Sequence, residues 1–136
     1  MKRQQKFITI VCHLSILLAR TGFGLLIPLL VFLNSKTLFD KKLHKVSFET
    51  FVFQAKITFT YLALQFLAVI YQIASSYLNH PALVKINYSE YNPVMVLSLL
   101  ANVVLTGGVI FGLIAAVLAS KNTDFTYPRF WLRKKK

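Results

Sequence analysis

The chain has 136 residues, of which 56% are hydrophobic and 15% are charged. A soluble domain of this length cannot cover so much apolar surface, because small folds leave much of their chain exposed. The composition therefore predicts an all-α integral membrane protein with a single membrane domain over residues 1–136. The formal net charge of +12 also occurs in nucleic-acid-binding proteins. Because basic residues commonly flank membrane spans, we expect the lipid bilayer as a partner and no nucleic acid.

The first apolar region, residues 7–33, is interrupted by the segment ARTGF at 19–23. It either crosses the membrane once or forms a helical hairpin with arms at 7–19 and 21–33. Outside this region, a single crossing leaves 11 basic residues on the cytoplasmic side and four on the other, whereas a hairpin leaves 14 and one. Since cytoplasmic segments retain basic residues, the count favours the hairpin.

Arg20 then lies at the tip of the hairpin. It either anchors the tip at the membrane interface or occupies a polar cavity with His13 and the face of the second helix that carries Gln65 and Gln72. Thr9, His13 and Arg20 share one helical face. That shared face favours the cavity.

The second region predicts a surface helix that runs into a span over residues 45–78. The part before Lys56 is amphipathic, which is typical of a helix at the membrane surface. Residues 57–78 contain no charge and are long enough to cross about 30 Å of hydrocarbon. One face carries polar residues that either bond to neighbouring helices or line a wetted groove, and the absence of charge favours the first. These residues are Gln54, Thr58, Tyr61, Gln65, Gln72 and Ser76.

The rest of the chain predicts an external loop at 79–93, a second span at 94–120 and a basic cytoplasmic tail at 121–136. In this span, small residues recur at every fourth position: Gly108, Gly112, Ala116 and Ser120. This spacing lets helix backbones approach closely. The neighbour is either a helix of this chain or a partner.

Catalytic patterns are sparse. The three histidines and four acids show no paired carboxylates and no zinc-ligand spacing, and no phosphate-binding loop occurs. We therefore expect no enzyme activity, no cofactor and no metal.

Three stretches resemble the Tic-twenty-like family of small bacterial membrane proteins, relatives of a component of the chloroplast inner-envelope protein translocon. They are HLS at 13–15, ETFVFQ at 49–54 and AAVLASKNTDFTYP at 115–128. The resemblance implies four membrane-embedded helical elements in the bacterial inner membrane, with both termini cytoplasmic. Val52 stands where that family usually has asparagine, and His44 is offset from the usual histidine.

The resulting hypothesis is a non-enzymatic subunit or accessory of a membrane complex, with protein translocation or export as the process that the resemblance implies. A second membrane protein or a second copy is the expected partner, and a self-assembling holin-like pore is the alternative function. The residues predicted to have structural or partner-facing roles are His13, Arg20, Glu49, Phe53, Gln54, Gln65, Gln72, Gly108, Gly112, Ala116, Tyr127 and Pro128.

Overall fold

The computed structural model describes residues 3–35, 41–78, 93–121 and 127. Apart from Gly22, Lys121 and Tyr127, the described residues are helical and form four α-helices and two 3₁₀ segments. They are α1 (Arg3–Leu14), η1 (Ser15–Thr21), η2 (Phe23–Leu25), α2 (Leu26–Ser35), α3 (Lys41–Leu78) and α5 (Pro93–Ser120). The all-α prediction is confirmed for this part of the chain. The predicted loop at 79–93, most of the basic tail and Pro128 lie outside the described residues.

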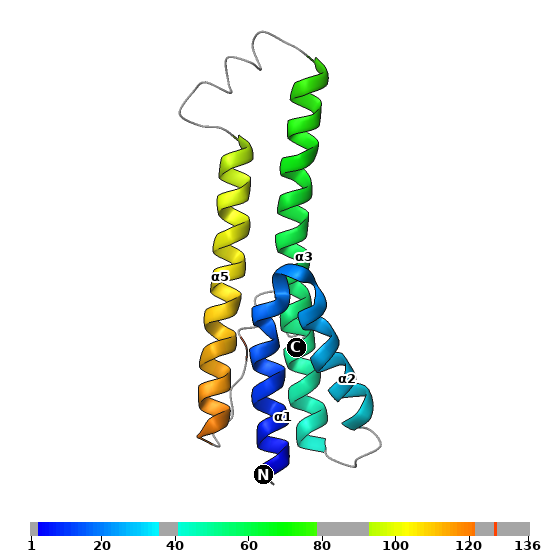
Figure 1. The fold of residues 1–136 in the computed structure, drawn as a ribbon, viewed down its shortest axis with the longest axis vertical. Helices are drawn as coiled ribbons and strands as arrows, with labels where there is room; N and C mark the ends of the chain where they lie inside the picture. The colour runs from blue at the N-terminus through cyan, green and yellow to red at the C-terminus, as the bar shows by residue number, and fades with distance from the viewer. Residues whose placement is uncertain (1–2, 36–40, 79–92, 122–126, 128–136) are drawn as a thin grey trace, which may run out of the picture.

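The helices form a bundle that is thicker at one end. In Figure 1, α1 and α2 lie beside the lower halves of α3 and α5, and the upper halves of α3 and α5 extend beyond them. The α3 segment Lys41–Tyr77 and α5 are long and apolar enough to cross a membrane, by length and composition. At 1.5 Å per residue, α3 is about 57 Å long and α5 about 42 Å.

Residues 7–33 form a helical hairpin, the arrangement that the charge count favoured. The chain reverses at Gly22, which has φ = 78° and donates its N–H to the Ala19 carbonyl at 3.1 Å. A residue with a side chain rarely adopts this left-handed conformation. Gly24 is required for a different reason, because a methyl group at this position would collide with the Ser15 carbonyl oxygen. Pro28 lies in the first turn of α2, where proline does not interrupt helical hydrogen bonds.

The second region forms a single helix, which runs from Lys41 to Leu78. It begins four residues before the predicted start at residue 45. The predicted position of its first part at the membrane surface stays a prediction. Ser47, Thr50 and Gln54 in its first half are fully buried, so this half is part of the bundle core. The amphipathic pattern reflects packing against α1 and α2, which cover this face of α3.

The small residues of α5 pack inside this chain. A methyl group at Gly108 would lie 2.7 Å from Ile57 Cγ2 of α3, and one at Gly112 would collide with Ile16 of η1. Ala115 and Ala116 are also buried. The core around them contains Ile16, Ala19, Phe53, Ala115 and Tyr127. The small-residue spacing is therefore explained by contacts within the chain.

Candidate functional site

A buried polar cluster joins α1, η1, α3 and the segment after α5. At its centre, His13 Nδ1 lies 2.6 Å from the Tyr127 hydroxyl and 3.3 Å from Thr50 Oγ1. Thr50 donates its own proton to the Val46 carbonyl at 2.8 Å, so towards His13 and Tyr127 it acts as an acceptor. Residues 13 and 127 are thus connected through a shared hydrogen-bond network.

Tyr127 also contributes its ring to this cluster. The ring stacks on Phe53 with centroids 4.1 Å apart and planes at 21°, and it lies 5.6 Å from the His13 ring. Burial raises the pKa of the Tyr127 phenol above its ordinary value, so the hydroxyl keeps its proton. Tyr127 is therefore attached to the bundle by stacking and by hydrogen bonding.

Gln54 performs a related task one helical turn further along α3. Its Nε2 donates to the Cys12 carbonyl and to Ser15 Oγ, both at 3.0 Å. Ser15 donates to the same Cys12 carbonyl at 2.6 Å. Carbonyls at the end of an α-helix lack their usual partner, and α1 gives way to a 3₁₀ segment at Ser15. Gln54 therefore satisfies the α1 terminus and ties it to α3.

A second histidine cluster, which the sequence interpretation missed, joins α2 to α3. His44 Nδ1 lies 2.9 Å from Ser35 Oγ and 3.2 Å from the Phe32 carbonyl, and its ring stacks on Phe32 with centroids 4.3 Å apart. Phe48, one turn along α3, also contacts the Phe32 ring. The aromatic residues at 32 and 48 with histidine at 44 were the available signal, but only the fold brings α2 beside α3.

The predicted cavity shared by Arg20 and His13 is wrong. The Arg20 side chain is exposed, and the hydrogen bonds of His13 go to Tyr127 and Thr50. The physical reason is the change from α-helix to 3₁₀ helix at Ser15. The change from 3.6 to 3.0 residues per turn alters which positions share a face, so Arg20 leaves the face of His13.

The polar face of α3 divides into two parts. Gln54, Thr58 and Tyr61 are buried, whereas Gln65 is half-buried and Gln72 is exposed. The hairpin covers only the first half of α3, which accounts for this difference (Figure 1). Glu49 is half-buried. Its predicted role at the start of the span stays a prediction.

The arrangement of these groups is suited to holding helices together. His13, Thr50, Gln54 and Tyr127 use their polar atoms on one another or on backbone groups. Within 3–35, 41–78, 93–121 and 127, no three histidine, cysteine or acidic side chains gather as metal ligands do. The described cluster links α1, η1, α3 and Tyr127 by hydrogen bonds between buried groups.

In the comparison with protein families, one family model matches nearly the whole chain. Residues 4–133 match the MamF/MmsF family, which is described as the magnetosome magnetite crystal formation protein family. The chain belongs to the MamF/MmsF family. No curated protein and no solved structure matches it.

Membership of the MamF/MmsF family corrects the expected Tic-twenty-like assignment. It gives no support to the translocation role that came with that resemblance. Several residues that carried the resemblance, among them Ser15, Gln54 and Tyr127, pack helices against one another. Such positions specify a bundle, and a bundle does not by itself identify a function.

Proposed function

We propose that this chain is a non-enzymatic integral membrane protein of the magnetosome membrane that takes part in forming the magnetite crystal. The observation that carries the proposal is the family match over residues 4–133. The process is the one that the family description names. A non-enzymatic role is supported by the polar core, whose groups hold helices together.

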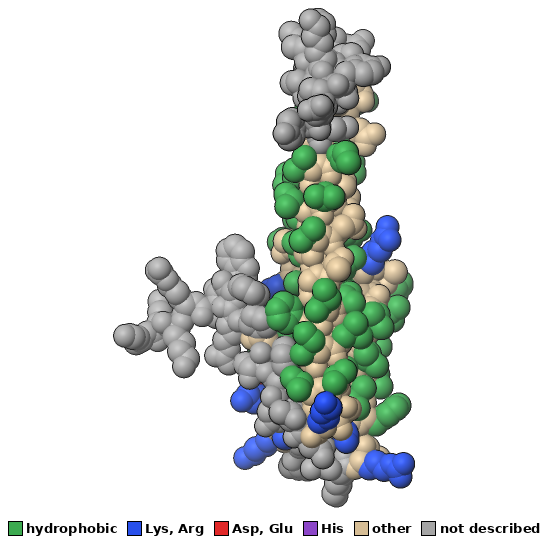
Figure 2. All heavy atoms as spheres, turned by 90° about the vertical axis from the view of Figure 1, so that its left-hand side faces the viewer, with side chains coloured by type: hydrophobic (Ala, Val, Ile, Leu, Met, Phe, Trp, Pro, Cys, Tyr) green, Lys and Arg blue, Asp and Glu red, His purple; other side chains and the backbone are tan. Residues whose placement is uncertain are grey.

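Membrane embedding is supported by the surface of the bundle. Large apolar side chains are exposed on all four helices, for example Phe7 on α1, Leu30 on α2, Phe66 on α3 and Leu99 on α5. Figure 2 shows such side chains along much of one side of the molecule. A soluble monomer rarely exposes apolar surface of this extent, whereas lipid tails cover it. The bundle is thus embedded with the hairpin among the membrane helices.

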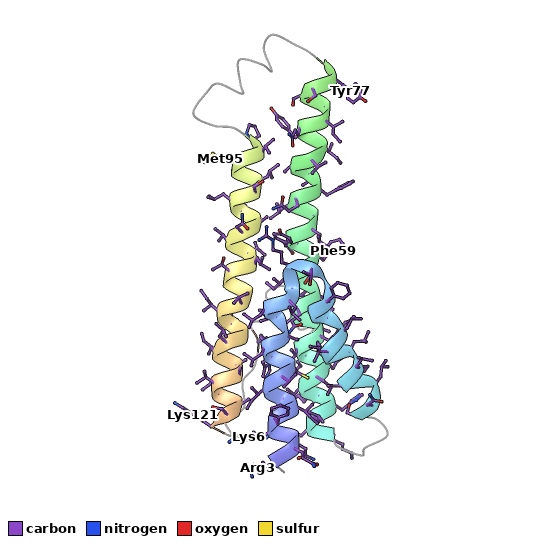
Figure 3. All side chains as sticks on the ribbon, in the orientation of Figure 1. Arg3, Lys6, Phe59, Tyr77, Met95 and Lys121 are labelled. Atoms are coloured by element: carbon purple, nitrogen blue, oxygen red, sulfur yellow. The ribbon has the colours of Figure 1, made fainter. Side chains whose placement is uncertain are left out.

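The orientation follows from the positions of the helix ends. α1 and α3 begin and α5 ends at the lower end of the bundle, where Arg3, Lys6 and Lys121 lie (Figure 3). The positive-inside tendency makes this end cytoplasmic. The upper ends of α3 and α5 then face the magnetosome interior. Because α3 is about 57 Å long and the hydrocarbon core about 30 Å thick, α3 tilts or extends past the far headgroups.

Deletion and complementation in the magnetite-forming bacterium that encodes the protein test the proposal. We expect a fluorescent fusion to co-purify with magnetically isolated magnetosomes, and deletion to change the size or number of crystals in electron micrographs. Complementation with the wild-type gene should restore both. A fusion confined to the cell membrane, together with unchanged crystals, would contradict the proposal. If induced expression abruptly stopped growth and collapsed the membrane potential, the holin-like alternative would replace it.

A further inference from the structure

We propose that the lower end of the bundle is a binding surface for anionic lipid headgroups. The inference extends the proposed function and rests on the membrane embedding proposed above. We call this surface the basic end. Its residues come from α1, α3 and the residue after α5: Arg3, Lys6, Lys41, Lys42, Lys45 and Lys121.

The positions of these residues give the first argument. Arg3, Lys6 and Lys121 are labelled at the same end of the bundle in Figure 3, and α3 begins there (Figure 1). Arg3, Lys41, Lys45 and Lys121 are exposed and Lys6 is half-buried. Figure 2 shows lysine and arginine side chains around this end. Segments far apart in the sequence are therefore brought together as one cationic surface.

The excess charge of this surface is large for the chain. The whole sequence contains only four acids, so they cannot neutralise the six cations of the basic end. Clusters of four to eight lysines and arginines beside a membrane span attract anionic lipids. Each such residue near an anionic membrane surface strengthens association about fivefold.

The neighbouring apolar side chains indicate a membrane surface as the partner. Directly above the basic end, exposed apolar residues begin on every helix: Phe7 on α1, Leu33 on α2, Phe48 on α3 and Val117 on α5. The change from charged to apolar surface thus occurs at one level around the bundle. A bilayer presents the same change between its headgroups and its hydrocarbon. Nucleic acid has no apolar layer that could cover the exposed apolar side chains above the basic end.

Lipid selectivity in reconstituted bilayers tests this proposal. The protein is placed in phosphatidylcholine vesicles that contain a trace of spin-labelled phosphatidylglycerol or spin-labelled phosphatidylcholine. Electron paramagnetic resonance then measures the fraction of each label immobilised at the protein surface. We expect wild type to prefer phosphatidylglycerol, and 1 M salt to weaken the preference, because salt screens exposed charges.

Two double variants locate the binding surface. Lys41→Gln/Lys45→Gln removes two charges from the basic end, and Lys56→Gln/Lys85→Gln removes two charges outside it, so their net charges are equal. We expect the preference to fall about threefold or more in the first variant and to stay near wild type in the second. An equal loss in both would show a response to net charge alone and overturn the proposal. Absence of any preference in wild type would also overturn it.

Two further measurements distinguish lipid binding at the basic end from a failure of membrane embedding and from binding of nucleic acid. Immobilised phosphatidylcholine in wild-type vesicles shows that the protein is embedded. If no label were immobilised, the membrane embedding in the proposed function would fail as well. Binding of a fluorescent oligonucleotide is measured in parallel. Oligonucleotide binding that Lys41→Gln/Lys45→Gln abolishes, with no lipid preference, would assign the surface to nucleic acid and overturn the lipid proposal.

Discussion

At the scale of single residues, the most informative contact joins Tyr127 to the bundle. Its ring stacks on Phe53 and its hydroxyl reaches His13, although residue 127 follows the end of α5 in the chain. A buried tyrosine stabilises a fold both through the packing of its apolar ring and through the hydrogen bond of its hydroxyl. The two contributions can be separated by substitution.

We predict that Tyr127→Phe lowers the free energy of unfolding by about 1 kcal/mol, the usual value of one hydrogen bond. Tyr127→Ala should lower it by about 3–5 kcal/mol, because it also leaves a cavity beside Phe53. Denaturation of the detergent-solubilised protein with sodium dodecyl sulfate measures both changes. Tyr77→Phe and Tyr77→Ala serve as controls, since the Tyr77 side chain is 86% exposed. Equal effects at residues 77 and 127 would contradict a specific role for Tyr127.

Arg20 belongs to the same scale. Its exposed side chain supports the interfacial-anchor interpretation over the cavity with His13. We predict that Arg20→Lys retains the wild-type yield of folded protein, because lysine also extends its charge towards the interface. Arg20→Leu should reduce the yield, because the tip loses its charged anchor. Size-exclusion chromatography in detergent measures the folded fraction. If Arg20→Lys were as damaging as Arg20→Leu, directed hydrogen bonds of the guanidinium would be required and the anchor interpretation would be wrong.

At the scale of elements, α5 is held close to its neighbours by residues without bulk. Gly112 faces η1 and Gly108 faces α3, whereas a methyl group at Gly107 would meet no atom within 4 Å. The two adjacent glycines at 107 and 108 therefore have different environments on one helix. This contrast provides a matched control.

We predict that Gly112→Ala lowers the free energy of unfolding by about 1–3 kcal/mol, as overpacking does in well-filled cores. The added methyl group would collide with Ile16 and lie 3.1 Å from the His13 carbonyl oxygen, which cannot move independently of α1. Gly107→Ala should be neutral or stabilising by up to about 1 kcal/mol, because alanine favours the helix. The same denaturation assay measures both. A Gly112→Ala protein as stable as wild type would show that α5 does not need this close contact.

At the scale of the whole molecule, topology is the property to test. Ser35 at the end of α2 and Ser47 in the first part of α3 are 1% and 0% exposed. A cysteine at either position would resist labelling from both sides of the membrane. Exposed positions at the basic end, such as Lys45 and Lys121, give an interpretable result.

We predict that Lys45→Cys and Lys121→Cys are protected from a membrane-impermeant thiol reagent in intact cells and react after permeabilisation. Ser89→Cys should react without permeabilisation in protein residing in the cell membrane. The natural Cys12 is buried and should not contribute. Labelling of Lys45→Cys in intact cells would contradict the proposed orientation.

The sequence by itself determined the helical class and the two long apolar helices, and it favoured the hairpin over a single crossing. These depend on composition, charge placement and the glycines at 22 and 24, which are local properties of the chain. The sequence did not determine which residues are in contact in the folded protein. The shift to 3₁₀ geometry at Ser15 separates Arg20 from His13, and the return of the chain after α5 brings Tyr127 to His13 and Phe53. Likewise, the small residues of α5 could have served a partner until α1, η1 and α3 were found against them. Such contacts join positions more than 30 residues apart, so only the tertiary structure decides them.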